Sequence, residues 1–170
     1  MKAIKLMLLV AAATMMFAAC GKEDPVVGDN QMIYDGKLYQ GEGRGSIQND
    51  FAELSCYSET EGQLFAIDCH IENLTSTNTY DLTKVDTEHG LHFHILVEGP
   101  GMQAEDIFDL QYQNSPQLWY FLNGDNVSGT SAFVSGTATA TVSDEKITLD
   151  VSGELVNGKS LAFRIVAPRD

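Results

Sequence analysis

Apolar and polar residues alternate along most of this chain from residue 31 onward, and this spacing restricts the fold class more than any other feature. In residues 91–98, Leu91, Phe93, Ile95 and Val97 alternate with His92, His94, Leu96 and Glu98. A period of two places the apolar side chains on one face of a β-strand, whereas an amphipathic helix needs a period near 3.6. Because the alternating segments are short and are separated by turn residues, we predict an all-β fold. It would be a single antiparallel β-sandwich or barrel-like domain of about 8–10 strands.

Turn residues predict how several of these strands pair. Asp35-Gly36 lies between two short apolar segments and is typical of a two-residue hairpin turn, in which both residues need positive φ. The glycine-rich residues 41–45 that follow are predicted to be a loop.

The C-terminal third predicts two further hairpins. Residues 143–146 form a polar turn, which predicts that Val142 pairs with Ile147. A two-residue turn at Asn157-Gly158 would then place the apolar residues of the last two strands on opposite faces. We therefore expect a β-bulge at Gly153 or Gly158.

Residues 1–19 have the organisation of an export signal. They begin with Lys2 and Lys5 and continue as an uncharged apolar run that is too short for a membrane-spanning helix. The run ends in Ala18-Ala19-Cys20-Gly21, which resembles the lipobox of bacterial lipoproteins. This resemblance implies cleavage before Cys20 and lipid attachment to it, and two or three acyl chains make a stable anchor. We predict a signal peptide over 1–19, a lipidated Cys20 with a flexible tether over 20–30, and the all-β domain over 31–170.

The acidic stretch after Cys20 extends this resemblance. Residues 21–24 are Gly-Lys-Glu-Asp, and the chain then carries the strand-forming segments 34–39, 79–83, 134–137 and 155–159. Together these features resemble the small all-β outer-membrane and surface lipoproteins of Bacteroidota-type bacteria. The resemblance implies residence in the outer membrane, at the cell surface or on the periplasmic face, and it brings no catalytic residues with it.

The charge of the chain excludes two classes of partner. Ten Lys and Arg stand against 24 Asp and Glu, which gives a formal net charge of −14. Nucleic-acid binding and adsorption to anionic lipid both depend on basic residues that contact phosphate. We therefore expect no nucleic-acid partner and no attachment to a membrane through a basic patch.

Cys56 and Cys69 lie in a third predicted hairpin, in which residues 51–57 pair with 64–71 around a turn at Gly62-Gln63. In that register the two cysteines are directly opposite on the apolar face, with Cβ atoms about 4.5–5.5 Å apart. Two interpretations remain open. The cysteines form a disulfide, which an oxidising compartment permits, or they remain thiols that fill the core as small apolar side chains.

The histidines are the candidate metal ligands. His92 and His94 point to the same side of one strand, about 6.5–7 Å apart, a spacing at which two imidazoles can share a metal. His89 lies just upstream, and His70 or Glu98 could supply a third ligand. The alternative is an ordinary solvated strand face without metal.

Aromatic residues near the middle of the chain indicate a binding function. Tyr112, Trp119 and Tyr120 are candidate platforms for sugar rings, because sugars stack on exposed aromatic faces. The sequence contains no Gly-x-Ser-x-Gly elbow and no phosphate-binding Gly-Lys-Ser/Thr loop. We expect a non-catalytic lipoprotein that binds a ligand, with glycan the first choice, and that needs no cofactor. The alternatives are a structural or assembly lipoprotein that docks an envelope protein, and a histidine-centred metal-dependent enzyme.

Overall fold

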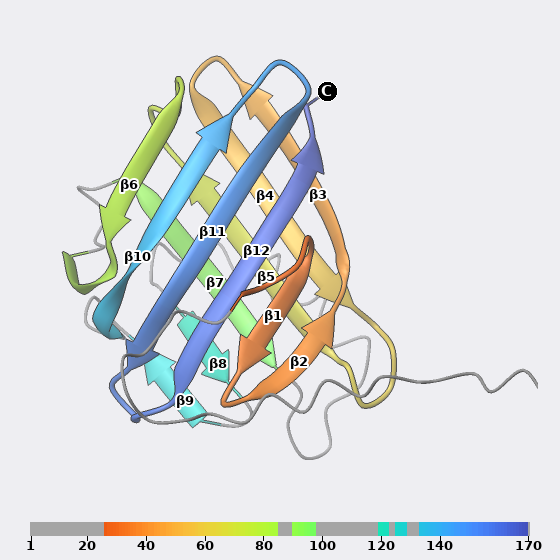
Figure 1. Ribbon diagram of the computed structural model, residues 1–170, viewed down its shortest axis with the longest axis vertical. Coiled ribbons are helices and arrows are strands. Elements are labelled where there is room, and N and C mark those ends of the chain that lie inside the picture. Colours follow the sequence, from red (N-terminus) through yellow and green to blue (C-terminus); the bar gives the residue numbers. More distant parts are fainter. Residues whose placement is uncertain (1–25, 85–89, 98–118, 123–124, 129–132, 170) are drawn as a thin grey trace, which may run out of the picture.

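The computed structural model describes residues 26–84, 90–97, 119–122, 125–128 and 133–169, with only the backbone described at 93–94, 119–122 and 125–128. Two six-stranded sheets pack face to face as a β-sandwich (Figure 1). Sheet A has the strand order β2-β1-β12-β11-β10-β6, and sheet B has the order β3-β4-β5-β7-β8-β9. The strands of sheet A are β1 (Gln31–Tyr34), β2 (Lys37–Gln40), β6 (Thr77–Asp81), β10 (Phe133–Val142), β11 (Lys146–Leu155) and β12 (Ser160–Pro168). Those of sheet B are β3 (Glu42–Gln48), β4 (Phe51–Ser58), β5 (Phe65–Ile71), β7 (Leu91–Val97), β8 (Trp119–Leu122) and β9 (Asp125–Ser128).

The fold class predicted from the sequence is confirmed. Neighbouring strands are antiparallel, apart from the parallel pair β7 and β8. The described residues form twelve strands, more than the expected number of about 8–10, and one 3₁₀ turn, η1 (Leu82–Lys84). Within these residues no helix is long and apolar enough to span a bilayer.

The core lies between the sheets and is built from every second residue of the strands. Because successive side chains of a strand point to opposite faces, each sheet buries one alternating set. Sheet A contributes Ala138, Ala140, Leu149, Val151, Phe163 and Ile165, and sheet B contributes Ala52, Leu54, Cys56, Ile67, Cys69, Ile71, Leu91 and Ile95. The outer face of sheet B is therefore left to the intervening residues, where the candidate site lies.

Two of the predicted turns are present. Tyr34 pairs with Lys37 across Asp35 and Gly36, whose φ values of 49° and 80° are those of the predicted two-residue turn. Val142 pairs with Ile147, as predicted.

The predicted bulge is at Gly158 rather than at Gly153. Gly158 has a φ of 78°, and the amide of Leu155 donates to the carbonyl of Lys159 at 2.9 Å across a three-residue loop. The extra loop residue shifts the register by one, so that Leu149 lies opposite Ile165 on the same buried face.

The predicted register between β4 and β5 is wrong by two residues. Leu54 pairs with Cys69, and Cys56 pairs with Ile67. The reason is the position of the turn: the amide of Gln63 donates to the carbonyl of Thr60 at 2.8 Å, so the turn is centred on Glu61 and Gly62, one residue before the predicted centre. A shift of two residues keeps each side chain on its predicted face, so the apolar set stays buried.

The predicted loop at 41–45 is instead part of a strand. Residues from Glu42 onward form β3, the edge strand of sheet B, which pairs with β4 and passes close to β12 of sheet A. A Cβ at Gly43 would meet the Asn30 side chain and would lie 2.6 Å from the carbonyl oxygen of Val166. Glycine is needed here because the backbones of the two sheets approach each other closely at this corner.

Residues 29 and 30 fasten the start of the domain to β12. The Oδ1 atom of Asn30 accepts a hydrogen bond from the backbone amide of Val166 at 2.8 Å, and the Asn30 carbonyl accepts one from Gly41 at 2.9 Å. Asp29 accepts from Nε of Arg164 at 2.8 Å, and Nη1 of Arg164 donates to Asp150 at 2.6 Å. We call this set of contacts the Asn30 latch. The chain is therefore held to β12 from Asp29 onward.

Candidate functional site

Several residues singled out from the sequence lie outside the described part of the chain. These are Cys20, His89, Glu98 and Tyr112. The backbones of Trp119 and Tyr120 are placed in β8, where Tyr120 pairs with Ile95 of β7 and Trp119 pairs with Ser128 of β9. Lipidation at Cys20 and sugar stacking on these aromatic residues therefore remain predictions.

The two core cysteines are free thiols in the structure, and both are buried. They lie two register positions apart rather than directly opposite, because Cys56 pairs with Ile67. Burial raises the pKa of the Cys56 thiol to about 12. Burial, with a smaller contribution from the charge of Asp68, raises the pKa of the Cys69 thiol well above its ordinary value. A thiol with a raised pKa is a poor nucleophile at neutral pH, so both residues serve as apolar core side chains.

The thiols of Cys56 and Cys69 are expected not to react with alkylating reagents in the folded protein. At pH 8, iodoacetamide should label Cys56 and Cys69 only after unfolding in guanidinium chloride, because the thiolate is both scarce and inaccessible. Peptide mass spectrometry measures labelling at each position. The variant Ser76→Cys, which places a thiol at an exposed position, is the control and should react in the native state. Native labelling of Cys56 or Cys69 at the control's rate would contradict this burial.

The predicted histidine cluster is arranged differently from the sequence expectation. His92 of β7 lies directly opposite His70 of β5, and the next pair along the same two strands is His94 and Asp68. His70 has two neighbours on this face of the sheet. Its Nε2 is 3.7 Å from Oδ2 of Asp68, and the centre of its ring is 5.7 Å from the centre of the Phe51 ring. Among the side chains that the structure describes, no three His, Cys, Asp or Glu groups are gathered around one point as metal ligands.

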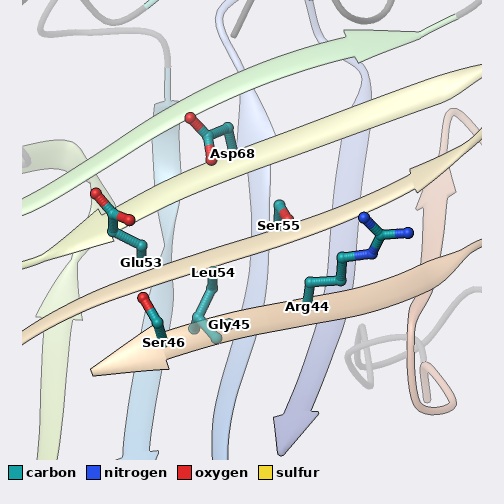
Figure 2. Close-up of a pocket in the computed structure, with 7 residues that line it drawn as sticks. All are labelled: Arg44, Gly45, Ser46, Glu53, Leu54, Ser55 and Asp68. Carbon is teal, nitrogen blue, oxygen red and sulfur yellow. The ribbon is translucent and has the colours of Figure 1, made fainter. Parts of the chain in front are cut away.

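The outer face of sheet B carries a shallow polar hollow of about 230 Å³ (Figure 2). Three neighbouring strands line it: β3 gives Arg44, Gly45 and Ser46, β4 gives Glu53, Leu54 and Ser55, and β5 gives Asp68. We call it the sheet B hollow. The register sets its layout, because Arg44 pairs with Ser55 and Ser55 pairs with Asp68 across the three strands. A cation and a carboxylate thus lie at opposite ends of one row, with a hydroxyl between them.

Aromatic rings lie beyond both ends of the hollow along β4. Phe51, Glu53, Ser55 and Tyr57 alternate with buried residues and so share the outer face. The guanidinium of Arg44 lies 5.0 Å from the centre of the Tyr57 ring, close enough for a cation–π contact. At the rise of an extended strand, Phe51 and Tyr57 are about 20 Å apart. The strip between them is long enough for an extended ligand.

Sequence reasoning missed this site for two reasons. The sequence predicts a loop at Arg44, and the neighbours across β3, β4 and β5 depend on a register whose prediction is wrong. One signal is present in the sequence: Phe51 and Tyr57 fall on the solvent side of an otherwise clean alternation. Large aromatic residues on a solvent-facing strand surface are more informative than the buried ones.

Comparisons with known proteins return no match among family models, curated proteins or solved structures. The proposals below therefore depend on the geometry of the described residues and on the sequence features of the N-terminal segment.

Proposed function

We propose that this chain is a non-catalytic, lipid-anchored outer-membrane lipoprotein that binds a glycan in the sheet B hollow. The observation that carries the proposal is the combination of a polar hollow with an aromatic ring beyond each end. Sites for sugars need both elements, because a pyranose ring has apolar faces and a rim of hydroxyl groups.

The groups around the hollow match a hydroxylated ligand. The carboxylates of Glu53 and Asp68 are acceptors for sugar hydroxyls, and the Arg44 guanidinium is a donor. The hydroxyl groups of Ser46 and Ser55 can each donate or accept a hydrogen bond. Hydrogen bonds to charged groups are stronger than those between neutral groups, so these side chains favour a polar ligand over an apolar one.

Exposure of the site favours binding over cleavage. A glycosidase needs one carboxyl group held protonated by burial or by a neighbouring charge, beside a second that stays ionised. Glu53 is exposed to solvent on an open sheet face. An open strip of this kind is better suited to holding a chain of sugars than to protonating a glycosidic oxygen.

The anchor part of the proposal comes from the N-terminal sequence. Ala18-Ala19-Cys20-Gly21 and the acidic residues after it support export and lipid attachment at Cys20. With a formal net charge of −14, the chain would gain little from electrostatic adsorption to anionic lipids, so acyl chains would have to hold it at the membrane.

Binding of the full chain, purified in detergent, to a panel of soluble polysaccharides tests the function. Affinity electrophoresis should show saturable retardation by one glycan, and the fluorescence of Trp119, the single tryptophan, gives a second readout. Glu53→Gln and Tyr57→Ala should each weaken binding about tenfold, as expected for loss of a charged hydrogen bond or a stacking contact. Asp144→Asn, an exposed carboxylate change in the β10–β11 turn, is the matched control and should leave binding unchanged.

Two results would contradict the proposal. Absence of retardation across a broad panel would overturn the glycan assignment, and crosslinking would then be used to search for an envelope protein partner. Saturable binding that neither Glu53→Gln nor Tyr57→Ala alters would overturn the location in the sheet B hollow. Trp119 and Tyr120, in β8 of the same sheet, would be the next residues to change.

A further inference from the structure

We propose that His70 and His92 bind a divalent transition-metal ion between strands β5 and β7. The two residues are directly opposite in the antiparallel ladder, and both occupy positions on the outer face of sheet B. Neither His70 nor His92 lines the sheet B hollow, so the inference goes beyond the proposed function, although Asp68 and Glu53 border both sites.

The pairing distance suits two ligands of one ion. Directly opposite residues of an antiparallel pair have Cβ atoms about 4.5–5.5 Å apart. Imidazole nitrogens bind zinc at about 2.0–2.1 Å, so two nitrogens on one tetrahedral ion are roughly 3.3 Å apart. Rotation about the side-chain bonds covers the difference, because both rings stand on the same face and are only partly buried. The rigid ladder then holds the two ligands at a fixed separation.

His70 is already oriented by its neighbours. Its Nε2 atom lies 3.7 Å from Oδ2 of Asp68, an ionic contact longer than a hydrogen bond, and Nδ1 of the same ring can bind the metal. The ring of Phe51 packs against the imidazole at 5.7 Å with an interplanar angle of 54°. A carboxylate behind a ligating imidazole fixes the ring and strengthens the metal bond, and such an arrangement is usual at metal sites.

The donor set selects the class of ion. Neutral imidazoles favour Ni²⁺, Cu²⁺ and Zn²⁺, whereas Mg²⁺ and Ca²⁺ require oxygen ligands. The proposal assigns two protein ligands to the ion, since no group of three candidate ligands is gathered among the described side chains. Glu53, which pairs with His70 from the other side, adds negative charge next to the site.

This arrangement differs from the cluster expected from the sequence. The sequence favours His92 and His94 along one strand, about 6.5–7 Å apart, with His89 upstream. The structure instead brings His92 opposite a histidine from a different strand, one that is 22 residues away along the chain. The two arrangements share His92 and, as a possible third ligand in the expected cluster, His70, so they are separated by replacing His94.

Calorimetric titration of the untagged full chain, in detergent, with NiCl₂ and with ZnCl₂ tests the site, and MgCl₂ serves as the negative control. We expect one ion per chain and a rise in Tm with added metal. His70→Ala and His92→Ala should each raise the Kd at least about tenfold, and Asp68→Asn should raise it about tenfold through the ring it orients. Asp144→Asn, an exposed carboxylate change in the β10–β11 turn of sheet A, is the control and should bind as the parent chain does. Thermal unfolding of each variant without metal checks that the fold persists.

The decisive comparison is between His70→Ala and His94→Ala. Loss of binding in His70→Ala with affinity retained in His94→Ala supports the proposal, whereas comparable loss in both variants would overturn it in favour of the cluster expected from the sequence. Unchanged affinity in a folded His70→Ala variant would overturn it, as would the absence of saturable binding to the parent chain.

Discussion

Replacement of Phe65 by alanine is expected to lower the free energy of unfolding by about 3–5 kcal/mol. Phe65 is fully buried and meets the ring of Tyr39 edge to face at a centroid distance of 5.8 Å. Phe65 also packs against the connection between β2 of sheet A and β3 of sheet B. A Cβ at Gly41, the residue in that connection, would lie 2.7 Å from Cζ of Phe65. Alanine would leave a cavity that borders both sheets, and rigid ladders on either side cannot collapse to fill it.

Urea unfolding of the full chain, followed by circular dichroism, measures this loss. Phe51→Ala is the matched control, because Phe51 lies on the outer face of sheet B and is only partly buried. Its replacement should cost about 1 kcal/mol or less, since it removes less apolar surface from contact and leaves no enclosed cavity. A loss of stability for Phe65→Ala that is no larger than the loss for Phe51→Ala would contradict the prediction that alanine leaves an enclosed cavity at position 65.

Replacement of Gly43 by alanine is expected to cost about 2–4 kcal/mol. Overpacking of a close contact accounts for about 1–3 kcal/mol. Displacement of the Asn30 side chain from the Val166 amide accounts for about 1 kcal/mol more. The added methyl group has little room, because the carbonyl oxygen of Val166 is backbone and would lie 2.6 Å away.

A double-mutant cycle with Asn30→Gly tests the cause of that loss. Asn30 has a φ of 56°, so glycine keeps the backbone conformation and removes only the side chain. The double variant should be more stable than the sum of the two single effects predicts, because one of the colliding groups is gone. Strict additivity would contradict a clash between residue 43 and Asn30. Thermal unfolding of the four chains under one set of conditions gives the coupling.

Local sequence signals predicted the parts of the fold that depend on local chemistry. Asp35-Gly36 determines its turn because its two residues accept positive φ. Gly158 supplies the bulge because the apolar residues on both sides of the turn must reach the same core. In both places one register alone satisfies the turn and the core together.

The register of β4 against β5 could not be predicted in the same way. An alternating pattern indicates which face of a strand is buried. It does not change when one strand is shifted by two residues against its neighbour, so it cannot distinguish the two registers. The position of the turn within the 59–64 connection settles the choice, and that connection carries no unambiguous turn signal. The sheet B hollow and the His70–His92 pair both depend on which residues face each other across strands, so neither could be derived from alternation alone.

The glycines of β3 concealed a strand because glycine is also the usual residue of loops. Their role appears only when β12 is placed beside them, since the absence of a side chain is what the contact requires. Arg44 lies between two of these glycines. It reaches the candidate site only because this segment is a strand paired with β4 rather than a loop.

If Cys20 carries the proposed lipid, the Asn30 latch limits how far the domain can move from the membrane. With the lipid on Cys20 and the chain held to β12 at Asp29, a linker of nine peptide units would join the bilayer and the sandwich. Fully extended, this linker reaches about 30 Å. Opening the latch would lengthen the linker by only one or two residues, because β1 is paired with β12 from Gln31 onward. The sandwich would therefore sample a thin layer next to the bilayer, and ligands held farther from the surface would lie beyond its reach.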